Sequence, residues 1–340
     1  AMHLTWQQSL AALLVEGVIF ILITFLNVRE RILDSIPRNL RYSISAGIGM
    51  FLAFIGLKNA GIVVADPDTF VALGRFTPEA LLGMLAIVLS AVLMARGVKG
   101  ALFIAIVAAT LVGLPIGVTQ MPQGWLPVSA PHSIAPIFCK FDFSGFFNLN
   151  MVLVIFSLLI INIFDTVGTL VGLAEKTGAV RPDGTIPRVR EAMLSDALGT
   201  TVSPILGSSS VTTYIESASG IAEGGRTGVT SLVTGLLFVV SLLLSPLFLV
   251  IPSAATSGAL VMVGVLMLDS VKKVDLSDVS ESFPAFTTML TMVLCYSIAN
   301  GICLGILSYV VIKACTSRWR DLNATLVVLA LLFVLKFVMG

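Results

Sequence analysis

Charged residues are scarce in this chain. They make up 11% of its 340 residues, whereas a soluble domain carries about 25%. Hydrophobic residues make up 57%, and the mean hydropathy is +1.03. This excludes an ordinary soluble domain, and the net charge of +1 without a basic stripe excludes a nucleic-acid-binding protein. A polytopic membrane protein is the class that remains.

Cysteine and histidine are also rare, with four and two residues. The cysteines lack the spacing of metal ligands, so we expect no metal or other cofactor. Intramembrane aspartyl proteases need two catalytic aspartates, one of them in a Gly-x-Gly-Asp stretch. That tetrad is absent from the sequence, and we therefore do not expect an enzyme.

Long apolar runs dominate the chain, and a spanning helix needs about 20 mostly apolar residues. The fold class is therefore an all-α polytopic membrane protein. Residues 207–222 are too polar for an ordinary span, and Pro204 and Gly207 predict a helix break before them. Residues 210–214 are then expected to be extended, with a half-helix beginning near Ile215. The eleven candidate spans are residues 7–27, 41–61, 78–95, 98–115, 151–174, 191–206, 228–250, 254–269, 284–299, 301–316 and 323–339.

Basic residues predict the orientation, because loops on the inner side of a membrane are enriched in Lys and Arg. The long loop 116–149 contains only Lys140 as a basic residue and is expected outside. The assignments alternate consistently from residue 7 to residue 320, and the role of 323–339 stays open. The inner segments are 28–41, 96–99, 175–190, Arg226, Lys272 with Lys273, and Arg318 with Arg320.

A weak internal repeat relates residues 4–115 to residues 226–316. Each copy has a span, a turn, a Gly-rich span and then a pair of helices expected to begin at a proline, Pro78 or Pro284. Three elements between residues 151 and 222 precede the second copy and have no counterpart before the first. Repeats with an odd number of spans are inverted relative to each other. We therefore expect a 7+7 inverted-repeat design, N-terminally truncated here by about three spans.

Asp165 lies near the middle of the apolar segment 151–174. A carboxylate there is costly unless it faces a polar cavity or partner. Burial disfavours the charged form of a carboxyl, so Asp165 is predicted to exchange a proton near neutral pH. The alternative is a structural hydrogen bond to a neighbouring helix. The small or polar residues that recur at helical spacing and predict a cavity face are Asn162, Asp165, Gly168, Thr169 and Gly172.

Glu216 is expected in the first turn of the half-helix, after the polar run 208–213. A helix start presents free N–H groups and the positive end of the helix dipole, which favour an acidic side chain. Many transporters build substrate sites from broken helices, so Glu216 is predicted to accept hydrogen bonds from a ligand. The alternative is an ordinary first-turn residue. Glu16 is a weaker candidate for a second proton or packing site, and Asp196 is expected near the inner boundary.

The sequence around these acids resembles the AzgA-like purine permeases. That family comprises carriers of adenine, guanine and hypoxanthine and is related to the xanthine–uracil permeases. The resemblance covers essentially the whole chain, and residues 56–61 and 319–323 look most like the adenine-carrying branch. The stretches that carry it are FDTVGTL (164–170), TTYIESASG (212–220), GGRTG (224–228), GIGMF (47–51), GLKNAG (56–61) and YSIANGI (296–302).

The resemblance implies two inverted repeats of about seven spans, arranged as a core domain that carries the substrate and a gate domain beside it. The first three spans of that design have no equivalent here. On this chain the core corresponds to residues 1–40 and 150–252. The gate corresponds to residues 41–149, with an outer loop, and 253–340, with a C-terminal helix.

The resemblance also implies a site. In the related carriers, an acid on the eighth span and another at the broken tenth span hold the base, and Asp165 and Glu216 match these positions. Thr169 stands where those carriers have a polar, proton-linked residue. Backbone amides just before the second acid belong here to Tyr214 and Ile215.

The implied function is proton-coupled uptake of a purine nucleobase across the bacterial inner membrane, with the proton as coupling ion. Adenine is the first candidate, and guanine and hypoxanthine are the others. Phe164 or Tyr214 is a candidate to stack on the base. Sliding of core against gate would alternate access, as in an elevator. The resemblance also suggests a homodimer, because related carriers are often dimers. The alternatives are another cargo on the same architecture, a pyrimidine or an anion, and a non-transporting truncated remnant. The two acids argue against an anion.

Overall fold

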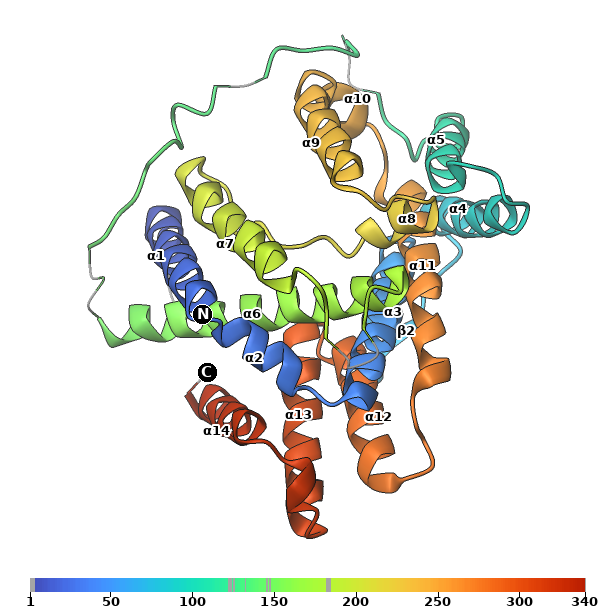
Figure 1. Ribbon diagram of the computed structural model, residues 1–340. Coiled ribbons are helices and arrows are strands. Elements are labelled where there is room, and N and C mark those ends of the chain that lie inside the picture. Colours follow the sequence, from blue (N-terminus) through green and yellow to red (C-terminus); the bar gives the residue numbers. More distant parts are fainter. Residues whose placement is uncertain are drawn as a thin grey trace. The chain divides into compact units, whose positions relative to one another are not determined.

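The computed structural model describes residues 4–121, 124, 126–131, 133–144, 146, 148–181 and 185–339. Over these residues it consists of helices and one short β-hairpin (Figure 1). The chain divides into two compact units, each described here by itself. Unit 1 comprises residues 1–48, 133–215 and 270–340, and unit 2 comprises residues 49–132 and 216–269.

Unit 1 is helical. The helix α3 (Arg38–Asn59) begins in this unit and ends in unit 2, and the 3-10 helix η1 (Asp269–Lys273) lies at the other unit boundary. The remaining elements of unit 1 are α1 (Trp6–Phe25), α2 (Val28–Ser35), α6 (Leu149–Thr177), α7 (Val189–Ile205), α12 (Val279–Leu294), α13 (Ile298–Cys315), η2 (Trp319–Asp321) and α14 (Ala324–Met339).

Unit 2 contains the hairpin and a set of shorter helices. The strands pair antiparallel, with Val63 opposite Leu73 and Asp66 opposite Phe70. The elements are β1 (Val63–Asp66), β2 (Phe70–Leu73), α4 (Pro78–Ala95), α5 (Ala101–Gly113), α8 (Ser217–Ala222), α9 (Gly228–Leu243), α10 (Ser245–Leu249) and α11 (Ser253–Leu268).

The predicted polytopic membrane fold is confirmed. Each predicted span overlaps a helix. The span 228–250 is interrupted between α9 and α10, and the span 284–299 runs past the end of α12 at Leu294. By length and composition, six described helices can cross a membrane, and three shorter ones are also apolar. The six are Trp6–Phe25, Arg38–Asn59, Pro78–Ala95, Met151–Thr177, Ser253–Lys273 and Ile298–Cys315.

Two expected connections contain regular structure instead. Residues 28–35 form α2, because Arg29, Ile32 and Leu33 recur at helical spacing and form one buried face of the helix. Residues 63–73 form the hairpin, whose side chains are mostly exposed. A short exposed strand carries little hydrophobic signal, and the sequence did not reveal it.

The expectation that a helix opens at Pro284 is wrong. The helix α12 begins at Val279, because the Asp278 side chain accepts a hydrogen bond from the backbone N–H of Ser280 at 2.9 Å. Such a cap satisfies one of the free donors at a helix start. The proline therefore lies inside the helix, whereas Pro78 does open α4, behind the Thr77 cap.

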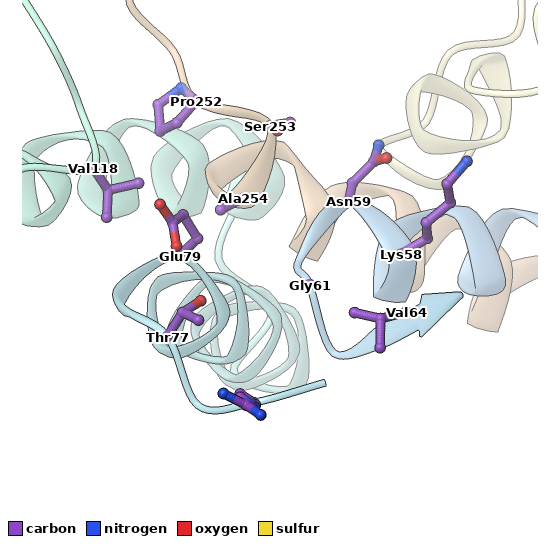
Figure 2. Close-up of a pocket in the computed structure, with 11 residues that line it drawn as sticks. Lys58, Asn59, Gly61, Val64, Thr77, Glu79, Val118, Pro252, Ser253 and Ala254 are labelled. Atoms are coloured by element: carbon purple, nitrogen blue, oxygen red, sulfur yellow. The ribbon is translucent and has the colours of Figure 1, made fainter. Parts of the chain in front are cut away.

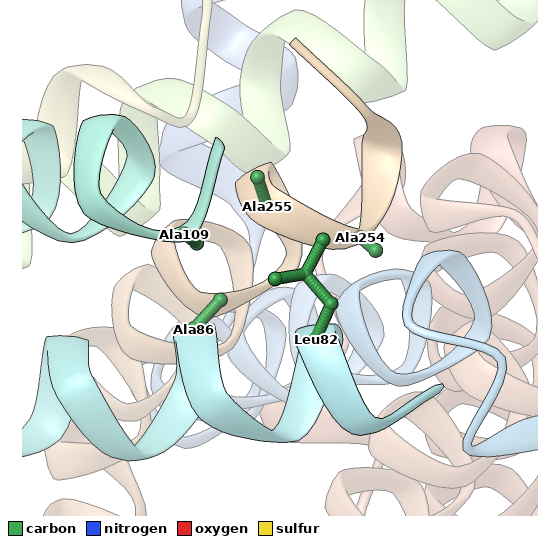
Figure 3. Close-up of a cluster of buried hydrophobic side chains, with 5 residues drawn as sticks. All are labelled: Leu82, Ala86, Ala109, Ala254 and Ala255. Atoms are coloured by element: carbon green, nitrogen blue, oxygen red, sulfur yellow. The ribbon is translucent and has the colours of Figure 1, made fainter. Parts of the chain in front are cut away.

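Small residues let the helices approach closely, as is common in membranes. In unit 2, a Cβ at Gly258 of α11 would overlap the carbonyl group of Ala86 on α4. In unit 1, a Cβ at Gly301 of α13 would overlap Met292 on α12. One buried cluster in unit 2 is built almost entirely from small side chains (Figure 3): Leu82, Ala86, Ala109, Ala254 and Ala255.

The two compact units differ from the predicted domains in four places. Residues 216–252, which were predicted as core, group with the segments of the predicted gate. The segments 41–48, 133–149 and 270–340, which were predicted as gate, group with those of the predicted core. The division into core and gate concerns how the protein moves, and it stays a prediction.

Candidate functional site

The chain is irregular between α7 and α8. Residues 208–214 have no regular secondary structure, and α8 begins at Ser217, two residues from the predicted start. Gly207 has a φ of 82°, a left-handed conformation that favours glycine. The predicted interruption is confirmed. Glu216 occupies the position before the first helical residue, and α8 is six residues long.

Asp196 on α7 holds this irregular segment. Its Oδ1 accepts hydrogen bonds from the backbone N–H of Thr213 at 3.2 Å and from the Thr213 hydroxyl at 3.4 Å. One turn later, the hydroxyl of Thr200 donates to the carbonyl of Val211 at 2.8 Å. The segment that leads to Glu216 is thus attached at two points to α7.

The second oxygen of Asp196 joins two further helices. It accepts a hydrogen bond from Thr166 Oγ1 on α6 at 2.8 Å and forms an ion pair with Arg29 on α2 at 3.0 Å. Arg29 is fully buried, donates to the carbonyl of Met193 at 3.2 Å, and lies 4.4 Å from the ring centroid of Phe20. We name Arg29, Asp196, Thr166 and Thr213 the Asp196 network.

Sequence reasoning missed this network. Asp196 was expected near the inner boundary, and Arg29 was counted only as a marker of the inner side. The pair is separated by 167 positions in the sequence. The one available signal was the spacing of Arg29, Ile32 and Leu33. This spacing places Arg29 on the same helix face as two apolar residues and indicates that it faces inward.

Asp165 is half-buried on α6. Its carboxyl interacts favourably with the backbone N–H of Ala299, at the start of α13, and with the ammonium group of Lys336 on α14. Lys336 in turn donates to the side-chain carbonyl of Asn300 at 2.8 Å. Asp165 therefore faces polar partners from two other helices of unit 1.

The rest of the predicted cavity face is occupied by protein. Asn162 donates to Glu16 Oε1 at 2.5 Å, and Glu16 is fully buried. A Cβ at Gly168 would lie 3.0 Å from Ile302 on α13, and Thr169 is also buried. Here α6 packs against α1 and α13, so the expectation of an open cavity along this whole face is wrong.

The two candidate aromatic rings lie in different environments. Phe164 is 2% exposed and meets Phe333 edge-to-face, with ring centroids 4.8 Å apart. Its ring faces are therefore occupied by protein, and Tyr214, which is 58% exposed, is the better candidate to stack on a ligand. Ile215 is buried and Glu216 is exposed.

Asp165 belongs to unit 1 and Glu216 to unit 2. Because the units are described separately, the expected pairing of these two acids stays a prediction. In the sequence, Glu216 follows Thr213 by three residues, and Thr213 is the residue whose backbone is hydrogen-bonded to Asp196.

A cavity of about 440 Å³ in unit 2 contains none of the predicted site residues (Figure 2). It lies beside the hairpin and the start of α4, and its charged lining residues are Lys58, Arg75 and Glu79. The predicted site residues therefore do not coincide with this cavity.

The chain is similar to known permeases over nearly its whole length. The family profile described as Permease family (Xan_ur_permease) matches residues 1–304. The adenine permease AdeP of Escherichia coli is 42% identical over 99% of this chain and 76% of its own length. The guanine/hypoxanthine permease PbuO of Bacillus subtilis is 38% identical over 98% of this chain and 78% of its own. These coverages do not establish that spans are missing here, and that expectation stays a prediction.

A solved structure has the same fold. The transmembrane domain of a cyanobacterial bicarbonate transporter, BicA, superposes with a TM-score of 0.58 at 16% identity, over 88% of this chain and 77% of that domain. At this identity the likeness concerns the fold alone. It confirms the polytopic helical fold.

Proposed function

Because this chain belongs to the xanthine–uracil permease family, a family of multi-pass membrane transporters rather than enzymes, we propose that it carries purine nucleobases across the membrane. The observation that carries the proposal is 42% identity over almost the entire chain to an adenine permease. The 38% identity to a guanine/hypoxanthine permease supports the same substrate class. Adenine is the first candidate cargo.

Glu216 is the proposed base ligand. It is exposed, and a carboxylate accepts hydrogen bonds, which suits the ring N–H and amino groups of a purine. The Asp196 network supports this role, because it attaches the preceding backbone to α7 at Thr213. The backbone amides of Tyr214 and Ile215 and the exposed Tyr214 ring would complete this side of the site.

Asp165 is the proposed coupling residue. It is a half-buried acid in the middle of a span, and intramembrane acids of this kind commonly relay protons. Thr169 lies one helical turn later and would assist in proton exchange. Glu216 is the second candidate for proton coupling. Symport with a proton would drive uptake across the inner membrane.

Movement of a core domain against a gate domain is the proposed way of alternating access. Inverted-repeat transporters commonly move one part of the protein as a rigid body around a fixed site. The Asp196 network joins α2, α6, α7 and the irregular segment, so these elements would move together. A homodimer in the lipid bilayer is part of this proposal and rests on the resemblance alone.

Direct binding of labelled adenine to the purified protein tests the ligand role. We expect Glu216→Gln to weaken binding by about 10- to 200-fold, because it replaces a charged acceptor with an amide and loses a charge-assisted hydrogen bond of about 1.5–3 kcal/mol. The matched control is Glu223→Gln, which changes an acid seven residues later. Unchanged affinity in Glu216→Gln would remove the residue from the site.

Proton-dependent uptake tests the coupling role. Asp165→Asn keeps the size of the side chain but cannot exchange a proton. We expect it to bind adenine while losing the acceleration of uptake by an imposed pH gradient. If Asp165→Asn retains that acceleration, Asp165 is not the coupling residue.

A further inference from the structure

A lysine in an apolar helix of unit 1 interacts with the proposed coupling residue. Lys336 is the one charged residue in the sequence of α14, so no acid of its own helix can pair with it. It is half-buried, and an ammonium group in apolar surroundings is costly unless it has polar partners. The partners of Lys336 on other helices therefore determine what it does.

A ring contact between α14 and α6 sets the position of Lys336. Phe333 of α14 is fully buried and meets Phe164 of α6 edge-to-face, with ring centroids 4.8 Å apart. In the sequence, Phe164 directly precedes Asp165, and Lys336 follows Phe333 by three residues. Residues three apart lie on the same side of a helix. The ring contact thus places the lysine and the acid at the same junction between the two helices.

The start of α13 connects the two charged groups. Lys336 Nζ donates to the side-chain carbonyl of Asn300 at 2.8 Å. The backbone N–H of Ala299, the preceding residue, interacts favourably with the Asp165 carboxyl. The hydroxyl of Ser297 accepts a hydrogen bond from the backbone N–H of Asn300 at 3.2 Å and caps this helix start. The ammonium and the carboxyl therefore contact adjacent residues of one capped turn, and they attract each other.

The other titratable groups near Asp165 do not supply a cation for it. Asp196 on α7 repels the charge of Asp165 and is itself paired with Arg29 on α2. Cys303 on α13 is a buried thiol. On α1, the helix that packs against the preceding turn of α6, Glu16 accepts a hydrogen bond from Asn162. Lys336 supplies the attraction that offsets these acids.

Building on the proposed coupling role of Asp165, we propose that Lys336 is the counter-ion that lets Asp165 release its proton. Desolvation favours the protonated form of a carboxyl, whereas a neighbouring cation favours the charged form. With the proton bound, Asp165 is neutral and Lys336 keeps its hydrogen bond to Asn300. On release, the O–H bond breaks, the proton passes to water, and the electron pair stays on the carboxylate, which then pairs with the ammonium group. Lys336 is a positioning residue, because it acts on Asp165 and not on the base.

A purely structural role is the alternative. Lys336 lies in the last turn of α14, where the helix dipole favours a cation. In that role Lys336 would contribute to the stability of α14 and would leave the protonation of Asp165 unchanged. The pH at which Asp165 takes up its proton therefore separates the two roles.

Infrared difference titration of the purified full chain in detergent measures that pH, because a protonated carboxyl has a carbonyl band that the carboxylate lacks. The band that is missing from Asp165→Asn belongs to Asp165. Lys336→Gln removes the charge and keeps a hydrogen-bond donor for Asn300, and Lys336→Arg keeps the charge. The matched control Lys99→Gln removes an exposed lysine of unit 2.

We expect the midpoint of the Asp165 band to move to higher pH by about 1–3 units in Lys336→Gln, because an opposite charge beside an aspartate has an effect of this size. Lys336→Arg and Lys99→Gln should both titrate as the unaltered protein does. An unchanged midpoint in Lys336→Gln, or an equal shift in Lys336→Arg or Lys99→Gln, would overturn the proposal.

Failure of the proposed coupling role gives a different result. If the unaltered protein shows no Asp165 band at any pH, Asp165 itself does not exchange a proton, and the role of Lys336 is overturned with it. Transport of a purine does not enter this readout, so the choice of cargo is tested separately.

Discussion

Both carboxylate oxygens of Asp196 accept hydrogen bonds. Arg29, Thr166 and Thr213 all donate to its carboxylate. The sequence was enough to single out Asp165 and Glu216 as candidate functional acids, because a carboxylate in an apolar segment is costly. The sequence could not predict the Asp196 network, because that network depends on which helices meet in three dimensions.

The buried ion pair gives the first stability prediction. Arg29→Met leaves Asp196 buried with two hydroxyl groups and an amide but no cation. Breaking a buried pair in this way costs about 3–5 kcal/mol, and we expect a loss of that size in the free energy of unfolding measured in mixed micelles. The control is Arg31→Met, an exposed residue on the same helix, which should change the value by less than about 0.5 kcal/mol. Equal losses would show that the pair contributes nothing specific.

Glu16 gives a prediction about protonation. It is fully buried on α1, and Oε2 has no hydrogen-bond partner among the described residues. An uncompensated buried charge is costly, so we expect the carboxyl to be neutral. Glu16→Gln should then keep the acceptor for Asn162 and unfold within about 1 kcal/mol of the unaltered protein, whereas Glu16→Ala should lose about 2–4 kcal/mol. A Gln variant as unstable as the Ala variant would show that the carboxyl is charged.

At the scale of helices, close packing rests on small residues. A Cβ at Gly258 would overlap the backbone carbonyl of Ala86, whereas one at Gly235 of α9 would meet nothing within 4 Å. We expect Gly258→Ala to lower the free energy of unfolding by about 1–3 kcal/mol through overpacking. Gly235→Ala should raise it by up to about 1 kcal/mol, because alanine favours the helix. Equal effects of the two substitutions would contradict the observed packing of α11 on α4.

The start of α12 gives a pH-dependent prediction. The hydrogen bond from Arg318, and then that from the backbone N–H of Ser280, lower the pKa of Asp278 to about 2. A lowered pKa in the folded state means that the stabilisation is complete above the unfolded value of about 4 and is lost as the pH falls toward 2. The difference in melting temperature between the unaltered protein and Arg318→Gln should therefore be constant above about pH 5 and vanish near pH 2. Because the pair is exposed, the difference should be small. A difference that stays constant down to pH 2 would contradict this role.

The helices themselves were predictable to the extent that membrane thickness determines them. Hydropathy located the spans, and the Pro204 and Gly207 pair located the irregular segment after α7. The hairpin of residues 63–73 was not predicted, because its strands are short and exposed. The start of α12 was misplaced because the Asp278 cap lies six residues before Pro284, the residue that was taken as the signal.

At the scale of the whole molecule, family membership and fold are established, and the division of the chain was only partly predictable. Residues 270–340 group with unit 1 because α13 packs against both α6 and α12. Contacts between segments that are distant in the sequence cannot be predicted from the hydropathy of each segment. The same limit applies to the proposed pairing of Asp165 and Glu216, since each was identified from its own segment.

Uptake of labelled adenine into proteoliposomes that contain the purified chain tests the central claim most directly. The account predicts saturable uptake that an inward proton gradient accelerates, that unlabelled guanine or hypoxanthine reduces, and that bicarbonate leaves unchanged. Glu216→Gln should reduce this uptake, whereas Glu223→Gln should not. Adenine uptake that is the same in liposomes with and without the protein, or reduced by bicarbonate but not by purines, would contradict the account.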